Sequence, residues 1–279
     1  MDWTYYDYIT GTKKGINDPN PGKRAKDAIR VVFIPWTAAE DDEWTAKTQD
    51  WIDINRDEKG KQIQMVHWDP ANRPNHILVG LTAHPDAVIY IRGHGSASTT
   101  RIGLRHTGRQ GEIEEEKLPI VDACQRLIDM GLDSAFCGTI KFYSCYSATK
   151  VVDVAGENAT IRSGNKFIEA GNKDRRGLGL PEKPLRPEID PKDNRSLAKR
   201  GADYLRGKGF TNCFFYGYLG PLASTYGDDP SAWVGPEEHK PSADVHRKSV
   251  AIINDFVNRP KNLNNLKGSI RASMGRIRV

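Results

Sequence analysis

The chain has 279 residues, of which 38% are hydrophobic and 28% charged, and its mean hydropathy is −0.62. That length permits one large domain with a full core. The sequence contains no apolar run of the roughly 18 residues that a membrane span needs, and its first residues lack the basic start and apolar stretch of a secretory signal. We therefore expect a cytoplasmic protein with no membrane partner.

The four cysteines, Cys124, Cys137, Cys145 and Cys213, form no C-x-x-C pair and are not densely spaced. In a chain of this size, such spacing favours reduced thiols in a cytoplasm over a disulfide framework. It is also unlike the spacing of zinc fingers, so the sequence predicts no metal site.

Residues 1–28 are polar and rich in turn-forming residues, which predicts an N-terminal arm. The main domain is expected to span residues 29–258. Hydrophobic runs and periodicity predict its first elements in chain order: a strand at 30–35, a helix introduced by the capping-box pair Thr37 and Glu40, a strand at 62–66, a short helix at 75–81 and a strand at 87–91.

The second half of the domain continues the alternation of strands and helices. Its predicted elements are a hairpin at 99–113, a helix at 114–132, a strand at 139–143, a short helix at 166–170, a long helix at 196–208 and a strand at 213–218. The acidic run 112–116 is interpreted as negative charge favouring a helix N-terminus. This order predicts an α/β fold with a mainly parallel sheet and helices on both faces.

Two segments lack the composition of a packed core. Residues 171–194 contain four prolines and three glycines among alternating charges, which predicts an exposed, mobile loop. Residues 259–279 are expected to form a basic tail, with five basic and no acidic residues from Lys261 onward. The tail is interpreted as a solvated terminus, with an acidic protein face as the alternative partner. It contains no aromatic residue, so nucleic-acid binding gains no support.

A histidine and a cysteine each follow a predicted buried strand. His94 and Gly95 come directly after the strand at 87–91, and Ser144 and Cys145 come directly after the strand at 139–143. Ligands and catalytic groups collect at the carboxyl ends of parallel strands. A nearby imidazole generates the thiolate that attacks carbonyl carbon. The backbone N–H groups of Gly95 and Cys145 are candidate donors to the resulting oxyanion.

A strand ending in His-Gly, followed 51 residues later by a strand ending in a small residue and Cys, resembles the caspase-like (clan CD) cysteine peptidases over roughly residues 29–220. Ser144 before the cysteine is closer to the bacterial toxin and CHAT-type branches. The resemblance implies a caspase-haemoglobinase-like three-layer sandwich, with His94 as general acid/base, Gly95 as oxyanion-hole donor and Cys145 as nucleophile. It implies no cofactor, and a protein or peptide as substrate.

The resemblance also suggests substrate-binding residues. Tyr218 follows the last strand, where the family forms one wall of the pocket, and Tyr143 and Ser144 precede the nucleophile. Tyr143 stands where clostripain-like enzymes carry an acid, so the motif transfers no preference for a charged P1 side chain. Asp228 and Asp229 are candidates to approach a basic P1 side chain.

The predicted loop at 171–194 contains the dibasic pair Arg175 and Arg176. Caspase-like enzymes are commonly switched on by cleavage of a linker between the cysteine and the last strands. The loop is therefore a candidate activation segment for an upstream protease, with an ordinary surface insertion as the alternative. Family precedent in prokaryotic antiviral defence and regulated cell suicide favours a zymogen.

Two other functions remain open. A cysteine-dependent α/β-hydrolase would carry glycines around the nucleophile and a histidine after it, whereas Cys145 lacks those glycines and His94 precedes it. The other alternative is a non-enzymatic binding protein with a caspase-like fold, and the retention of both His-Gly and Cys argues against it.

Overall fold

A computed structural model describes the chain at residues 5–7, 12–14, 28–40, 45, 48–49, 52–53, 62–95, 99–107, 113–148, 154–193, 195–218, 222–223, 250–251, 270–271 and 276–279. Among these residues, no helix combines the length and the apolar character needed to cross a membrane.

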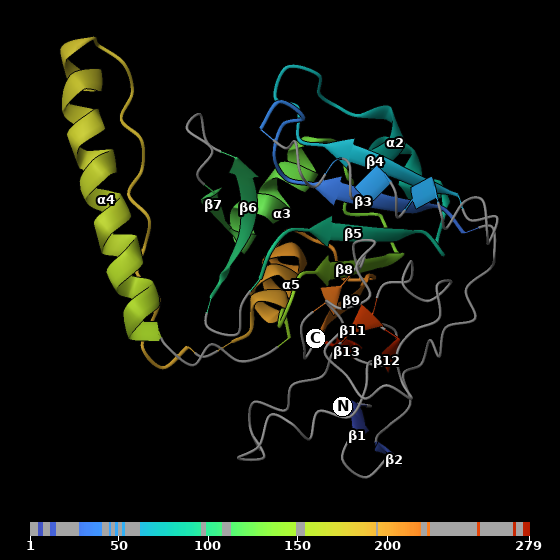
Figure 1. Cartoon of the computed structure of the whole chain (residues 1–279). Helices are drawn as coiled ribbons and strands as arrows, with labels where there is room; N and C mark the ends of the chain where they lie inside the picture. Colours follow the sequence, from blue (N-terminus) through green and yellow to red (C-terminus); the bar gives the residue numbers. More distant parts are fainter. Residues whose placement is uncertain are drawn as a thin grey trace.

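The centre of the molecule is a six-stranded sheet with the order β13-β9-β8-β5-β3-β4 (Figure 1). Its strands are β3 (Arg30–Ile34), β4 (Ile63–His67), β5 (Val88–Arg92), β8 (Thr139–Tyr143), β9 (Phe214–Tyr218) and β13 (Arg276–Arg278). All neighbouring pairs are parallel except β13 with β9. The predicted α/β class and mainly parallel sheet are confirmed.

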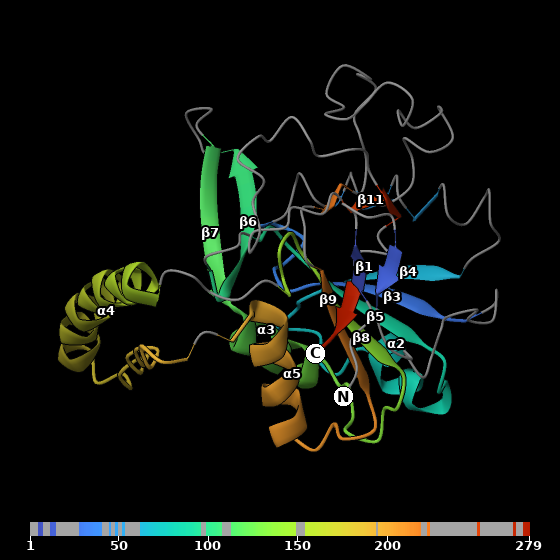
Figure 2. The same ribbon diagram turned by 90° about the horizontal axis from the view of Figure 1, so that it is seen from below.

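One face of the sheet forms the apolar core beneath α3 (Ile120–Asp129) and α5 (Leu197–Gly207), which lie side by side in both ribbon views (Figures 1 and 2). The ring of Phe142 lies against Gly201 of α5, and Phe142 and Phe215 are fully buried. The short α2 (His76–Gly80) begins at Asn75, whose side chain caps it and whose N–H donates to the Met130 carbonyl after α3. A 3₁₀ turn, Leu81–Ala83, follows α2.

The opposite face carries more polar side chains. Tyr90, Lys141 and Tyr216 lie in register on β5, β8 and β9, so they point to the same side. The Lys141 ammonium lies 4.8 Å from the centre of the Tyr90 ring. Tyr143 stands edge-on to both Tyr90 and Tyr218, with ring centres 5.6 and 5.3 Å apart. These aromatic and cation–π contacts hold the carboxyl ends of the strands together.

The segment after His94 is a longer hairpin than predicted. It consists of β6 (Arg101–Thr107) and β7 (Ile113–Pro119), and α3 begins only at Ile120. The predicted helix start at residue 114 is therefore wrong, and residues 113–116 of the acidic run belong to β7 rather than to a helix N-terminus. The register pairs residues 101–107 with residues 113–119 in one continuous antiparallel ladder, so the backbone of residues 113–116 takes part in strand pairing.

The segment after Cys145 also differs from the prediction. A single helix, α4, spans Val154–Gly177, and residues 178–193 return beside it (Figures 1 and 2). The expected short helix at 166–170 and loop from 171 are therefore wrong up to residue 177. We call α4 and residues 178–193 the arm. Glu157 in the first turn of α4 is buried, pairs with Arg101 at 3.0 Å and accepts from the Thr100 hydroxyl, joining the arm to the start of β6.

The C-terminal residues 276–279 are not a solvated tail. β13 pairs antiparallel with β9 in the main sheet, and Val279 is buried. The Arg278 guanidinium lies 4.7 Å from the centre of the Phe214 ring, and Arg206 of α5 donates to the Val279 carbonyl at 2.7 Å. The sequence did not predict this strand, because its alternating basic residues are typical of an exposed tail and nothing in the sequence shows that Arg278 stacks on a ring.

Smaller strand pairs complete the described chain. β1 (Tyr5–Asp7) and β2 (Thr12–Lys14) form a hairpin within the predicted N-terminal arm. A three-stranded sheet has the order β10-β11-β12 and contains Leu222–Ala223, Val250–Ala251 and Ile270–Arg271.

Candidate active site

The two predicted catalytic segments leave the same edge of the sheet. Arg92, the last residue of β5, is paired in register with Tyr143, the last residue of β8. Because these neighbouring strands are parallel, the residues that follow them emerge side by side. The chain therefore brings His94 and Cys145 to adjacent positions in two neighbouring loops.

Gly95 fixes how closely the two loops approach. A methyl group in place of its hydrogen would collide with the carbonyl oxygen of Cys145 and would stand 3.0 Å from the Cβ and Oγ of Ser144. Only a residue without a Cβ fits there unless one loop moves. This backbone contact between the His-Gly loop and the Cys loop is the central geometric feature of the site.

The backbone of His94 is held from its other side by the hairpin. Its N–H donates to the Gly103 carbonyl at 2.7 Å, and its carbonyl accepts from the Gly103 N–H at 2.9 Å, so β6 pairs with the histidine itself. His94 is half-buried, with Nε2 covered. The crossing is tight, because a Cβ on Gly93 would lie 3.2 Å from the Gly103 carbonyl oxygen. The hairpin thus fixes the main-chain position of the candidate base.

Cys145 is a half-buried, reduced cysteine at the start of a sharp turn. The next residue, Tyr146, has φ = +55°, and it is the only non-glycine residue in the described part of the chain with a positive φ. A left-handed conformation costs a bulky L-residue about 1–2 kcal/mol. Strain of this kind clusters at functional turns, where the surrounding structure maintains it. The turn directs the chain away from β8 immediately after the candidate nucleophile.

Ser147 ties this turn to the rest of the fold. Its buried hydroxyl donates to the Phe142 carbonyl at 2.7 Å and accepts from the Tyr218 N–H at 2.9 Å, so it joins the ends of β8 and β9. Its carbonyl accepts from the Ala198 N–H in the first turn of α5 at 2.7 Å. The sequence analysis did not single out Ser147, since a serine two residues after a cysteine carries no distinctive pattern.

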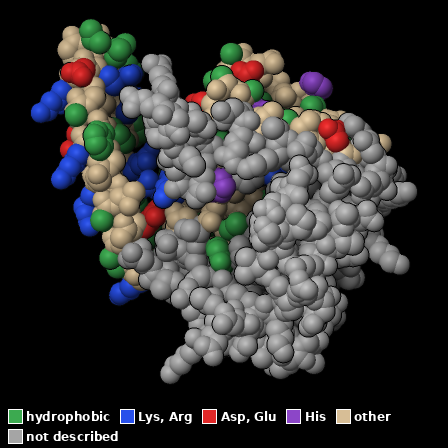
Figure 3. Space-filling view, viewed as in Figure 1, with side chains coloured by type: hydrophobic (Ala, Val, Ile, Leu, Met, Phe, Trp, Pro, Cys, Tyr) green, Lys and Arg blue, Asp and Glu red, His purple; other side chains and the backbone are tan. Residues whose placement is uncertain are grey.

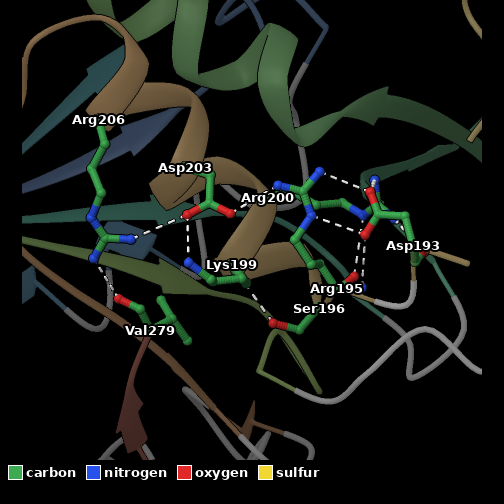
Figure 4. A network of polar contacts seen from close by, with 8 residues as sticks. All are labelled: Asp193, Arg195, Ser196, Lys199, Arg200, Asp203, Arg206 and Val279. Atoms are coloured by element: carbon green, nitrogen blue, oxygen red, sulfur yellow. Dashed lines mark hydrogen bonds and ion pairs between the residues drawn. The ribbon is translucent and has the colours of Figure 1, made fainter. Parts of the chain in front are cut away.

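A polar network surrounds the start of α5 (Figure 4). Ser196 caps the helix, and Arg195 joins Asp193 to Asp203 at distances of 2.8 and 2.9 Å. The hydrogen bonds from Arg195 lower the pKa of Asp193 to about 2, against a smaller opposing effect of burial. Arg200 adds a second contact to Asp193 at 3.0 Å. The network holds the first turn of α5, on which the Cys145 loop rests.

The predicted substrate-binding residues on the two strands are buried. Tyr143, Ser144 and Tyr218 are 6%, 2% and 2% exposed. The two tyrosines pack on each other across the polar face of the sheet, and Ser144 packs against Gly95. Their side chains are therefore buried at the carboxyl edge of the sheet. Asp228 and Asp229 lie outside the described residues.

The proposed cleavage residues lie in the arm. Arg175 and Arg176 are in the last helical turn of α4. Arg175 Nε donates to the Pro181 carbonyl at 2.6 Å, and Arg176 pairs with Glu182 at 3.2 Å. Both arginines thus bridge α4 to the returning segment, an arrangement that the composition of residues 171–194 did not indicate.

Two of the other cysteines are buried and unreactive. Burial raises the pKa of both Cys124 and Cys213, in the latter case to about 12, and Cys213 Sγ donates to the Phe136 carbonyl at 2.9 Å. Thiols of this kind carry almost no thiolate near neutral pH. Cys137 is half-buried, and all four cysteines are reduced. Within the part of the chain that the structure describes, no cluster of three or more His, Cys, Asp or Glu side chains suits a metal ion.

Comparison with known proteins does not identify a family for the chain. No protein-family model matches the chain, and no curated protein matches it significantly.

Proposed function

We propose that the protein is a caspase-like cysteine endopeptidase in which Cys145 attacks the substrate and His94 acts as general acid and base. The observation that carries the proposal is the contact between Gly95 and the Cys145 carbonyl, because it places the His-Gly and Cys loops together at the carboxyl edge of a parallel sheet. The strained turn at Tyr146 supports the same assignment.

In the proposed reaction, His94 takes the thiol proton and the Cys145 thiolate attacks the carbonyl carbon of the scissile peptide bond. Backbone N–H groups of Gly95 and Cys145 stabilise the oxyanion. His94 then donates its proton to the departing amine, leaving a thioester. Water, deprotonated by His94, hydrolyses the thioester, releases the carboxylic acid and restores the thiol.

A peptide-library assay tests this function. Purified protein is incubated with fluorogenic peptides that vary at P1, beside Cys145→Ala and His94→Ala variants. The proposal predicts cleavage by the unmodified protein and a loss of at least about 10³-fold in either variant, as expected when one member of a catalytic pair is removed.

Cys137→Ala is the matched control, because Cys137 is also a reduced, half-buried cysteine. It is expected to retain full activity. If Cys145→Ala retains the cleavage activity, or if Cys137→Ala removes it, Cys145 is not the nucleophile. A protein that cleaves no peptide before or after treatment with an activating protease would favour a binding role for this fold.

We further propose that cleavage in the arm activates the enzyme. The burial of Tyr143, Ser144 and Tyr218 supports a zymogen form in which the substrate groove is not open. Residues 177–180 at the end of the arm are all exposed, and Gly179 has φ = +65°. Cleavage after Arg175 or Arg176 additionally requires the last helical turn to open, since both side chains hold residues of the return segment.

Limited digestion with trypsin tests this activation. The expected result is a cut near Arg176, measured by intact-mass analysis, accompanied by a rise in peptidase activity. A variant with Arg175→Gln and Arg176→Gln should resist both the cut and the rise. Full activity in an uncut protein would contradict the zymogen proposal while leaving the His94–Cys145 assignment intact.

A further inference from the structure

Three asparagines hold the two halves of the arm together. Asn158, Asn165 and Asn172 recur every seven residues along one side of α4. Each side-chain amide donates to one backbone carbonyl of the return segment and accepts from the N–H of the same residue, at 2.7–2.8 Å, and the residues so paired are Lys183, Arg186 and Ile189. We call these three paired contacts the asparagine ladder.

The ladder has a period of seven residues on the helix and three on the return segment. Seven residues of α-helix advance about 10.5 Å, and three residues of polyproline II (PPII) helix advance about 9.3 Å. A return segment in the PPII conformation therefore presents every third backbone unit to the same side of α4. Prolines at 181, 184 and 187 have the same period of three and fix φ near the PPII value.

The prolines are offset from the residues that the ladder uses. Because PPII has three residues per turn, Pro181, Pro184 and Pro187 form one ridge and the ladder residues form another. All three prolines are exposed, and Leu180 and Leu185 beside them are 47% and 48% exposed. The proline ridge is thus held in an extended conformation with its apolar surface toward solvent.

The charge of this surface is basic. Both glutamates between residues 180 and 189 are neutralised by α4, since Glu182 pairs with Arg176 and Glu188 pairs with Arg162 at 2.8 Å. Lys183 is exposed and Arg186 is half-buried, close enough to Asp122 of α3 to oppose the rise in pKa that burial causes there. Figure 3 shows Lys and Arg side chains gathered along the arm.

We propose that the proline ridge is a docking site for a partner domain with an aromatic-lined, acidic groove of the kind that recognises PPII segments. The segment from Pro181 to Arg186 has the pattern P-x-x-P-x-Arg. Aromatic grooves bind such segments because the PPII conformation is already formed and loses little entropy. The ladder supplies that order before the partner arrives, and Lys183 and Arg186 are complementary to acidic residues at the rim of the groove.

Titration with an SH3 domain selective for P-x-x-P-x-Arg ligands tests this docking site. Binding of the full-length chain is measured by isothermal titration calorimetry, beside a synthetic peptide of residues 178–193. We expect Pro184→Ala and Arg186→Gln each to weaken binding about tenfold, as loss of a central contact does. The ladder should make the chain bind several-fold more tightly than the free peptide.

Pro191→Ala is the matched control, because Pro191 is exposed but lies beyond the last rung of the ladder at Ile189. It should bind as the unmodified chain does. The proposal is overturned if the full-length chain does not bind, if Pro191→Ala weakens binding as much as Pro184→Ala, or if only the charge variant weakens binding. The last result would identify a non-specific electrostatic surface. If the full-length chain does not bind, the peptide titration shows the reason: a peptide that binds means that the ridge is covered in the folded chain, and a peptide that does not bind means that the sequence is unsuitable.

Discussion

Ser147 shows how one hydroxyl positions a candidate nucleophile located two residues earlier. It connects the end of β8, through the Phe142 carbonyl, to the end of β9, through the Tyr218 N–H. Both groups lie in the interior of the fold, where a polar atom without a partner is costly. The position of the Cys145 loop therefore depends on this side chain as well as on the strand from which the loop emerges.

Ser147→Ala should lower the free energy of unfolding by about 1–3 kcal/mol, because it removes two buried hydrogen bonds, one accepted from the Tyr218 N–H and one donated to the Phe142 carbonyl. Urea denaturation measures this change. Ser163→Ala on the exposed side of α4 is the control and should change stability by less than about 0.5 kcal/mol. Equal stabilities for the two variants would show that Ser147 does not join the strands.

The four thiols should differ in their alkylation by iodoacetamide. At pH 8, Cys145 and Cys137 are expected to be modified before Cys124 and Cys213, which peptide mass spectrometry can follow. Burial raises the pKa of Cys213 from the ordinary value near 9 to about 12. In the folded state the Cys213 thiol therefore keeps its proton to a higher pH than in the unfolded state. The contribution of this thiol to stability is full below pH 9 and falls as the pH rises toward 12. Early labelling of Cys213 in folded protein would contradict this burial.

At the scale of elements, the buried parallel strands of the main sheet were predictable and the arm was not. Continuous apolar runs such as 30–34 and 139–143 become buried strands because both faces of the sheet are covered. α4 lacks an apolar stripe, since asparagines occupy positions that face the return segment. Prolines and glycines then suggested a loop, although the prolines pre-form the segment that the asparagines bind. The seven-residue recurrence of Asn was the available signal.

The predicted strands account for only part of the candidate site. Placing His94 and Cys145 at strand ends required only the two apolar runs before them. The close approach at Gly95 and the support from Ser147 depend on contacts between loops far apart in the sequence, which local patterns do not record. The polar residues of β7 were assigned to a helix because the sequence does not show that this segment pairs with β6.

Asn165→Ala should loosen the arm without unfolding the sheet. It removes two hydrogen bonds at 2.8 Å, both to the backbone of Arg186. Hydrogen exchange of residues 183–189 should become at least about tenfold faster, whereas exchange in β5 and β8 should not change. Lys166→Ala, at the next position of the same helix and exposed, is the control. Unchanged protection in Asn165→Ala would show that the ladder does not hold the return segment.

At the scale of the whole molecule, the main sheet joins segments that lie between residues 30 and 278 of the chain. β13 closes its edge beside β9, so residues 276–278 contribute to the same sheet that positions the His94 and Cys145 loops. The carboxyl end of β9 in turn holds the Cys145 loop, through Tyr218 and Ser147. An unpaired β9 would also present an open edge to other chains.

Deletion of residues 276–279 should therefore lower the melting temperature and promote aggregation. Loss of the edge strand and of buried Val279 is expected to cost several kcal/mol, or roughly 2–4 °C for each kcal/mol in a protein of this size. Differential scanning fluorimetry and light scattering measure both effects. Val279→Ala should cause a smaller loss than the deletion. A deleted chain as stable as the full one would mean that β13 contributes little to the sheet.

The most direct measurement of the central claim is the rate at which iodoacetamide alkylates Cys145 between pH 5 and 8, followed by peptide mass spectrometry in the unmodified chain and in His94→Ala. If folding places the imidazole of His94 beside the thiol, Cys145 should react at least about tenfold faster in the unmodified chain at pH 6.5, because the histidine stabilises its thiolate. Cys137 serves as the internal reference and should react equally in both proteins. Equal rates for Cys145 in the two proteins would contradict the proposed pair.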